Sequence, residues 1–208
     1  MGLDGQLIGK DSEEFSDLEE KLVEELNRSV GIRLPIGQLY GQAYFERIGR
    51  YSDLQRLRSY AAHIAVFKKP PDSLDAEPIS EELRMMYDGS MPFSHPHLMN
   101  HSDCEGYYVP TPFPDPVQVP LLLAIDAESN QSEQVWHADV GSSAILLREL
   151  ESINEFLRLP DAARQKRQNK PLLEPVEGDI WAGIKWAWTV LYWLAQESVE
   201  RNVLIMFS

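Results

Sequence analysis

The chain has 208 residues, of which 43% are hydrophobic and 25% are charged. This is the composition of an ordinary folded protein, and it excludes a disordered or fibrous chain. The 33 acidic and 19 basic residues give a formal net charge of -14. Because that charge repels polyphosphates and anionic lipids, nucleic acid and membranes are poor partners, and a basic protein is favoured electrostatically.

Several features of the sequence point to one cytoplasmic domain. The length suits a single hydrophobic core. A lone cysteine, Cys104, excludes an internal disulfide framework, and the first residues lack a secretory signal pattern. The longest apolar stretch, 180–195, contains Lys185 and is too short to cross a membrane, so it predicts a buried helix.

Apolar residues at steps of three and four predict amphipathic helices along the chain. Residues 32–49 between the first two helices contain Pro35, Gly37 and Gly41, which predicts a structured loop. The expected helices cover residues 12–30, 52–66, 80–89, 143–159 and 179–198. The last of them has aromatic residues around nearly its whole surface, so it needs cover on most sides.

Short apolar runs predict strands in the second half of the chain. They are Gly106 to Val109, Leu121 to Ile125, Gln134 to His137 and Val203 to Phe207. The second run is continuous and apolar, as expected of a central strand, and the third returns beside it as a hairpin. We therefore expect a helix-dominated α+β fold with a small, mostly antiparallel sheet covered by the amphipathic helices.

The densest group of potential metal ligands lies in the proline-rich middle of the chain. His95, His97, His101 and Asp103 fall within nine residues, and imidazole and carboxylate groups are ligands for zinc. The spacing matches no established zinc motif. Histidines in such a segment are also typical of a hydrogen-bonded loop, so the preferred interpretation is a structural loop without a cofactor, and a divalent metal such as zinc is the alternative.

The turn Gly141-Ser142-Ser143 stands where a strand gives way to a helix. Ser142 is a candidate nucleophile, with His137 and Asp139 nearby, and Glu105 or His137 is a candidate general base. A glycine at 145 would be needed for a nucleophile elbow, but Ile145 stands there. A serine cap at the start of the helix explains the turn without catalysis.

Partner contact is assigned to the aromatic stretch and to this turn, through Tyr107, Tyr108, Ser142 and Ser143. Aromatic residues of the last helix, among them Trp181, Trp188 and Tyr192, offer a wall for a small-molecule cavity, although aromatic residues at helical spacing are usually part of a core.

The segment His101-Ser102-Asp103-Cys104-Glu105-Gly106-Tyr107-Tyr108-Val109-Pro110, with Val140-Gly141-Ser142-Ser143 and Leu146-Leu147-Arg148-Glu149-Leu150 downstream, resembles small uncharacterised bacterial proteins. The pattern is similar to toxin-immunity and accessory proteins. The resemblance implies no activity, cofactor or catalytic residue.

Two functions follow from these observations. The first is a non-catalytic protein-binding or regulatory protein, for example an immunity-type inhibitor of a basic partner, because the chain is acidic and has no strong catalytic motif. The alternative is a metal-dependent hydrolase that uses the cluster of histidines and Asp103. A small-molecule sensor is a third, weaker option.

Overall fold

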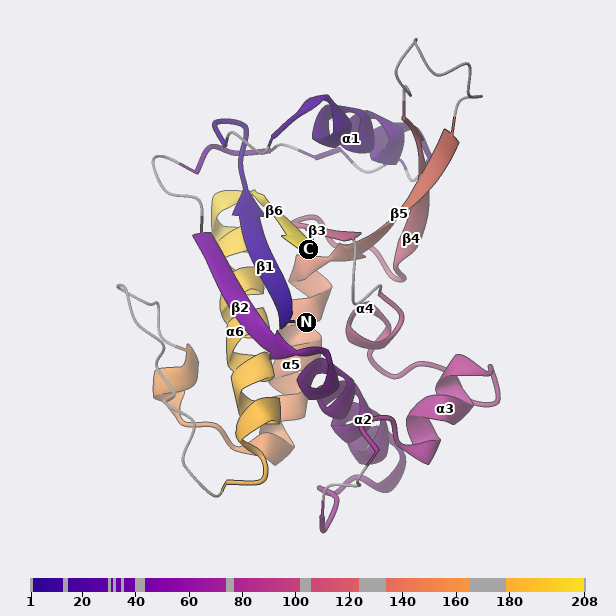
Figure 1. Cartoon of the computed structure of the whole chain (residues 1–208), viewed down its shortest axis with the longest axis vertical. Coiled ribbons are helices and arrows are strands. Elements are labelled where there is room, and N and C mark those ends of the chain that lie inside the picture. The colour runs from indigo at the N-terminus through magenta and orange to yellow at the C-terminus, as the bar shows by residue number, and fades with distance from the viewer. Residues whose placement is uncertain are drawn as a thin grey trace.

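A six-stranded sheet runs through the structure, with helices on both of its faces (Figure 1). The computed structural model describes residues 2–12, 15–29, 31, 33–34, 36–39, 44–73, 77–101, 106–123, 134–164 and 179–207. In chain order the elements are β1 (Gly2–Ile8), α1 (Asp17–Ser29), β2 (Tyr44–Arg50), α2 (Tyr51–Phe67), α3 (Glu81–Tyr87), α4 (Pro96–Met99), β3 (Gly106–Val109), β4 (Val117–Leu123), β5 (Gln134–Ser142), α5 (Ser143–Leu157), the 3-10 helix η1 (Asp161–Arg164), α6 (Ala182–Arg201) and β6 (Leu204–Phe207).

The fold is α+β, but the expected small, mostly antiparallel sheet is wrong. The sheet is mixed and has the strand order β2-β1-β6-β3-β5-β4. Strands β3 and β5 pair in parallel, with Tyr107 opposite Val140, whereas the other neighbours pair antiparallel. The sheet is larger than expected because β1 and β2 extend it beyond β6.

No strand was expected in either of these two segments. Strand β1 contains two glycines and an aspartate, which are depleted in strands. Helix α6 passes close above Gly5: a Cβ atom there would lie 2.5 Å from Cδ1 of Leu194, so a larger residue would need the Leu194 side chain to shift. Strand β2 occupies the end of the segment 32–49 that was expected to be a loop.

The strands in the second half of the chain are confirmed, with one change of position. Strand β4 lies at the edge of the sheet and not at its centre, and Pro120, which has no N–H to donate, lies within it. The predicted return strand continues beyond His137 to Ser142 as β5, paired antiparallel with β4. The apolar segment 204–207 is buried in the sheet as β6, between β1 and β3.

The predicted helices are present with shifted ends. Helix α2 begins at Tyr51, one residue before the expected start, and the Asp53 carboxylate accepts a hydrogen bond from the Arg50 N–H. Ser80 caps α3 through the Leu83 N–H as expected. Helix α6 begins at Ala182, after Asp179 has accepted a hydrogen bond from the Trp181 N–H.

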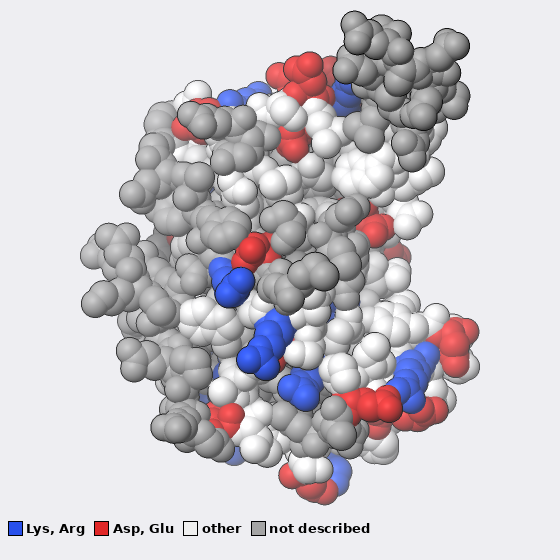
Figure 2. All heavy atoms as spheres, viewed as in Figure 1, with Lys and Arg blue, Asp and Glu red and all other residues white. Residues whose placement is uncertain are grey.

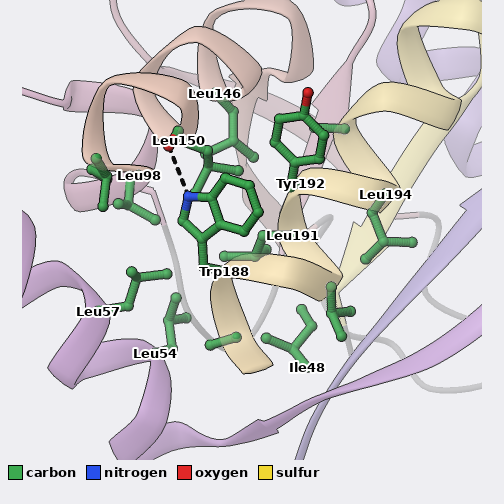
Figure 3. Packing of buried hydrophobic residues seen from close by; sticks show 14 of the residues in the cluster. Ile48, Leu54, Leu57, Leu98, Leu146, Leu150, Trp188, Leu191, Tyr192 and Leu194 are labelled. Carbon is green, nitrogen blue, oxygen red and sulfur yellow. Dashed lines mark hydrogen bonds between the residues drawn. The ribbon is translucent and has the colours of Figure 1, made fainter. Parts of the chain in front are cut away.

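Two hydrophobic clusters lie on opposite faces of the sheet. On one face α2, α5 and α6 form the larger cluster, in which the Trp188 ring is fully buried and its Nε1–H donates to the Leu150 carbonyl at 2.7 Å (Figure 3). On the other face α1 places Leu22 and Leu26 against β3, β4 and β5. Neighbouring residues of one strand point into different clusters: Tyr108 belongs to the first and Tyr107 to the second.

Within the part of the chain that the structure describes, no helix combines the length and the apolar character that crossing a membrane requires.

Candidate functional site

The His97 ring is fixed by hydrogen bonds on both of its nitrogens. Nδ1 accepts a hydrogen bond from the Ser142 N–H at 2.9 Å, so Nε2 carries the proton and donates to the Phe113 carbonyl at 2.9 Å. The ring is fully buried, and burial lowers its pKa against the raising effect of the carbonyls of Phe113 and Pro114. His97 is therefore a neutral group that joins three segments of backbone.

The other two histidines of the segment, His95 and His101, also make hydrogen bonds, each to different groups. Ser152 donates its hydroxyl proton to the Glu149 carbonyl, so its Oγ accepts from His95 Nε2 at 2.9 Å, and burial lowers the His95 pKa to about 4. His101 donates from Nε2 to the Tyr107 carbonyl and stacks on the Tyr108 ring, with centroids 4.0 Å apart. Each ring thus contacts a different set of groups.

Metal coordination by this segment remains a prediction. Among the described residues, no group of three or more His, Cys, Asp or Glu side chains is arranged to hold a metal ion. Asp103, the fourth member of the expected ligand set, and Glu105, the candidate base, lie outside the described residues. The three imidazoles by themselves do not surround a common point.

The turn at Ser142 has the capping role expected from the sequence. The Ser142 hydroxyl accepts a hydrogen bond from the Ile145 N–H at the start of α5, and Ser143 donates to the Val109 carbonyl. Both serines are fully buried. His137 is exposed on β5 and lies five residues from Ser142, about 17 Å along a strand, so these two side chains do not form a catalytic pair.

The aromatic candidates are also internal. Tyr107 and Tyr108 are 3% and 2% exposed. A partner would have to open the sheet to contact them or the two buried serines. Trp188 and Tyr192 stack with ring centroids 4.7 Å apart inside the larger cluster, and Trp181 packs edge-on to Tyr60, so these rings belong to the core.

The exposed side of α1 carries a run of three carboxylates. Asp17, Glu20 and Glu24 are exposed, and none of them forms an ion pair with another described residue. Lys21 lies among them, whereas Arg28 is paired with Glu25 at 2.6 Å. In Figure 2 acidic side chains gather at the top of the molecule, where α1 lies in Figure 1.

The inward side of α1 anchors this helix to the sheet. Glu19 is buried, and its Oε2 accepts from the N–H and the hydroxyl of Ser16, which is a capping arrangement. Its Oε1 accepts from the Tyr107 hydroxyl at 2.8 Å. Leu22 and Leu26 pack into the smaller cluster one turn apart. The outward carboxylates are therefore carried on a helix that is fixed at its N-terminus and along its length.

Some acidic residues elsewhere are paired with nearby cations. Next to α3, Arg84 pairs with both Glu77 and Glu81. Basic side chains occupy the middle of the face shown in Figure 2. Arg47 and Arg50 of β2 are both exposed. Helix α1 thus offers a partner three exposed carboxylates, with Lys21 among them.

The sequence as a whole matches a known family. The family is described as "Putative DNA-mimic protein", and the match covers residues 5–207. The chain belongs to this family. Neither the curated proteins nor the solved structures contain a match to it.

Membership of the DNA-mimic family overturns the immunity-type inhibitor of a basic partner expected from the sequence and gives the alternative, a metal-dependent hydrolase, no support. A DNA mimic occupies the DNA-binding site of a DNA-binding protein. This kind of target differs from that of an immunity-type inhibitor of a basic partner, so the expectation of such an inhibitor is wrong. The metal-dependent hydrolase is likewise unsupported. Net charge alone misled the choice of partner, because it gives the sign of a partner's field but not the class of site that is recognised.

Sequence reasoning also missed α1 as the candidate surface. Asp and Glu crowd the first turns of this helix, but acids are placed favourably at any helix N-terminus, so their number alone does not indicate a binding surface. A helical projection separates the two roles, since Glu19 falls on the apolar side with Leu22 and Leu26 while Asp17, Glu20 and Glu24 do not.

Proposed function

We propose that this protein binds the DNA-binding site of a DNA-binding protein and so blocks that site. The observation that supports the proposal is the family match over 203 of the 208 residues, from 5 to 207. The exposed carboxylates of α1 would take the places that phosphates occupy in the natural complex. The cytoplasm of a bacterial cell, which holds the DNA, is the setting that fits.

The spacing of these carboxylates is compatible with that role. Asp17, Glu20 and Glu24 stand three and four residues apart, which is about 4.5 and 6 Å along a helix. One strand of duplex DNA carries a charge about every 3.4 Å of its axis. The charge density along α1 is thus of the same order as that of one strand, and the anchored helix keeps the charges in a fixed row.

Competition with duplex DNA tests this function. The full chain is immobilised and exposed to a nuclease-treated extract of its source cells, and captured proteins are identified by mass spectrometry. A captured DNA-binding protein is then purified, and its affinity for the chain is measured with and without duplex DNA. We expect DNA and this chain to exclude each other from the partner, and the binding to weaken as salt is raised.

A charge variant assigns the contact to α1. The triple substitution Asp17→Asn, Glu20→Gln and Glu24→Gln should weaken binding about tenfold or more, if each exposed carboxylate contributes roughly 0.5 to 1 kcal/mol. The matched control removes three exposed charges elsewhere, by Asp72→Asn, Glu155→Gln and Asp161→Asn. Simultaneous binding of DNA and this chain to one partner would contradict the function. Equal effects of the two triple variants would contradict only the assignment to α1.

A further inference from the structure

The short helix α4 is held at its two ends by two buried charged side chains from different helices. At the N-terminal end, Glu149 of α5 accepts from the His97 N–H at 3.1 Å through Oε1 and from the Leu98 N–H at 2.8 Å through Oε2. At the C-terminal end, Arg58 of α2 donates from Nε to the Leu98 carbonyl at 2.8 Å and from Nη2 to the His101 carbonyl at 2.7 Å. Glu149 is 7% exposed and Arg58 is 3% exposed.

Helix α4 depends on these two groups because it is too short to stabilise itself. It has four residues and begins with Pro96, which has no N–H. The N–H groups in the first turn of any helix have no acceptor within the helix. For His97 and Leu98 that acceptor is the Glu149 carboxylate, so the state of this one group decides whether both N–H groups are satisfied.

Glu149 is also the group in this cluster whose protonation changes near neutral pH. Burial raises its pKa to about 7, although the N–H groups of His97 and Leu98 act to lower it. Around it, His95 and His97 have lowered pKa values owing to burial and are neutral in this range. The buried Tyr108, whose hydroxyl donates to the His97 carbonyl, has a raised pKa owing to burial and also stays neutral.

We propose that Glu149 is a proton-sensitive clamp on α4. As a carboxylate it accepts both N–H groups; on protonation one oxygen becomes an O–H donor, and the N–H group that faces it loses its acceptor. Arg58 continues to hold the C-terminal end, so the loosening starts at His97 and Leu98. The proposal does not depend on the proposed function.

The residues that directly follow the clamped N–H groups line a pocket. Met99, Asn100 and His101, which follow the clamped residues directly, line one side of a pocket of about 440 Å³ together with Arg58. The other side of the pocket includes Gln118 and Asp139, which are joined by a hydrogen bond of 3.0 Å. Loosening α4 therefore changes one wall of this pocket while β4 and β5 hold the other in place.

Amide hydrogen exchange at single-residue resolution tests the clamp on the full chain. Between pH 8 and pH 6, after correction for intrinsic exchange, the protection of the His97 and Leu98 amides should fall about fivefold, as expected for the loss of one hydrogen bond. The effect of Glu149 on global stability has the opposite sign, since protonation of a carboxyl with a raised pKa favours the folded state. A change in global stability caused by Glu149 itself therefore cannot produce the expected loss of protection.

Two variants on the same helix complete the test. Glu149→Gln should show the lower protection at both pH values, because an amide has one acceptor oxygen and one donor nitrogen. The matched control, Glu155→Gln, removes an exposed carboxylate of α5 and should behave as the wild type. Equal protection of the wild type at both pH values would overturn the proposal, as would a pH-dependent loss that persists in Glu149→Gln.

A measurement on the wild type alone covers the case in which Glu149→Gln does not fold. The Glu149 carboxyl carbon is titrated by NMR together with the backbone nitrogens of His97 and Leu98. We expect one common midpoint between pH 6 and pH 8 for all three signals. A carboxyl that titrates without any change at the two amides, or that stays ionised down to pH 5, would overturn the proposal.

Discussion

The Tyr107 hydroxyl donates a hydrogen bond of 2.8 Å to Oε1 of Glu19, which lies 88 residues earlier in the chain. The bond joins β3 to α1, and both side chains are buried. Burial, together with the nearby Glu19 carboxylate, raises the Tyr107 pKa, so the phenol remains a donor at any ordinary pH. The one inward carboxylate of α1 thus attaches the helix whose outward carboxylates form the candidate surface.

Removing this hydroxyl should destabilise the protein. Tyr107→Phe leaves one oxygen of a buried carboxylate without its donor, so we expect the free energy of unfolding to fall by about 1 to 3 kcal/mol. Urea denaturation at pH 7 measures the change. Tyr192→Phe is the matched control, because its hydroxyl donates to Glu151 over 3.3 Å at a partly exposed site. A loss as large in the control would contradict the special role of the Tyr107 bond.

The two tryptophans of α6 should differ in their importance. Trp188 is fully buried and donates to the Leu150 carbonyl, so Trp188→Phe leaves a cavity and loses a hydrogen bond, which we expect to cost about 2 to 3 kcal/mol. Trp186 lies at the rim and donates to the Arg47 carbonyl at an exposed site. Trp186→Phe should therefore cost less than about 1 kcal/mol. Thermal and urea unfolding of the two variants compares them directly.

The stability of Glu149→Gln relative to the wild type should depend on pH. The folded-state pKa of Glu149 is raised to about 7, above its ordinary value of 4.5. Between these values the folded chain binds more protons than the unfolded chain, so wild-type stability from this group falls as pH rises. Glu149→Gln lacks this penalty. Its free energy of unfolding should therefore rise by about 3 kcal/mol relative to that of the wild type between pH 4.5 and pH 7.5, and the difference should stay level above pH 7.5.

The effect of His95 on stability changes with pH in the direction opposite to that of Glu149, so the two effects can be told apart. Its folded-state pKa is lowered to about 4 from 6.5, so its contribution to stability is present above pH 6.5 and is lost as pH falls toward 4. The comparison of Glu149→Gln with the wild type cancels this effect, since both carry His95. A stability difference that is constant from pH 5 to pH 8 would show that Glu149 has no raised pKa.

Chelation should leave the protein unchanged. In the structure both nitrogens of His95 and both nitrogens of His97 already make hydrogen bonds within the chain. We therefore expect the melting temperature to be the same with and without EDTA, and also after addition of zinc. Elemental analysis of the purified chain provides the second readout. A melting temperature that falls with EDTA and recovers with zinc would instead support the metal site predicted around Asp103.

The parts of the fold that follow a repeating pattern were predictable from the sequence. Helix α5 and strand β6 have their apolar residues at regular steps, and their type and approximate limits were correct. Strand β1 was missed because two glycines and an aspartate, residues that are depleted in strands, stand in it. The edge position of β4 was missed because a continuous apolar run is also produced when a helix, here α1, covers an edge strand.

The candidate site was less accessible to sequence reasoning. Histidines and serines attract attention as chemical groups, yet His97 and Ser142 are hydrogen-bonded to each other within the core. What distinguishes Glu19 from Glu20 is only the direction in which each points from α1, and that depends on which face of the helix meets the sheet. Burial of Glu149 and Arg58 depends on contacts between segments about 40 and 50 residues apart, which no local pattern encodes.

The place of β6 in the sheet sets the order in which the protein is completed. Strand β6 pairs with β1 on one side and with β3 on the other, and it is the link between the β1–β2 pair and the β3–β5–β4 group. A chain that ends before residue 204 lacks the strand that hydrogen-bonds these two groups of strands to each other. Stalled or shortened chains that lack this segment expose two open sheet edges, which makes them natural substrates for chaperones and proteases.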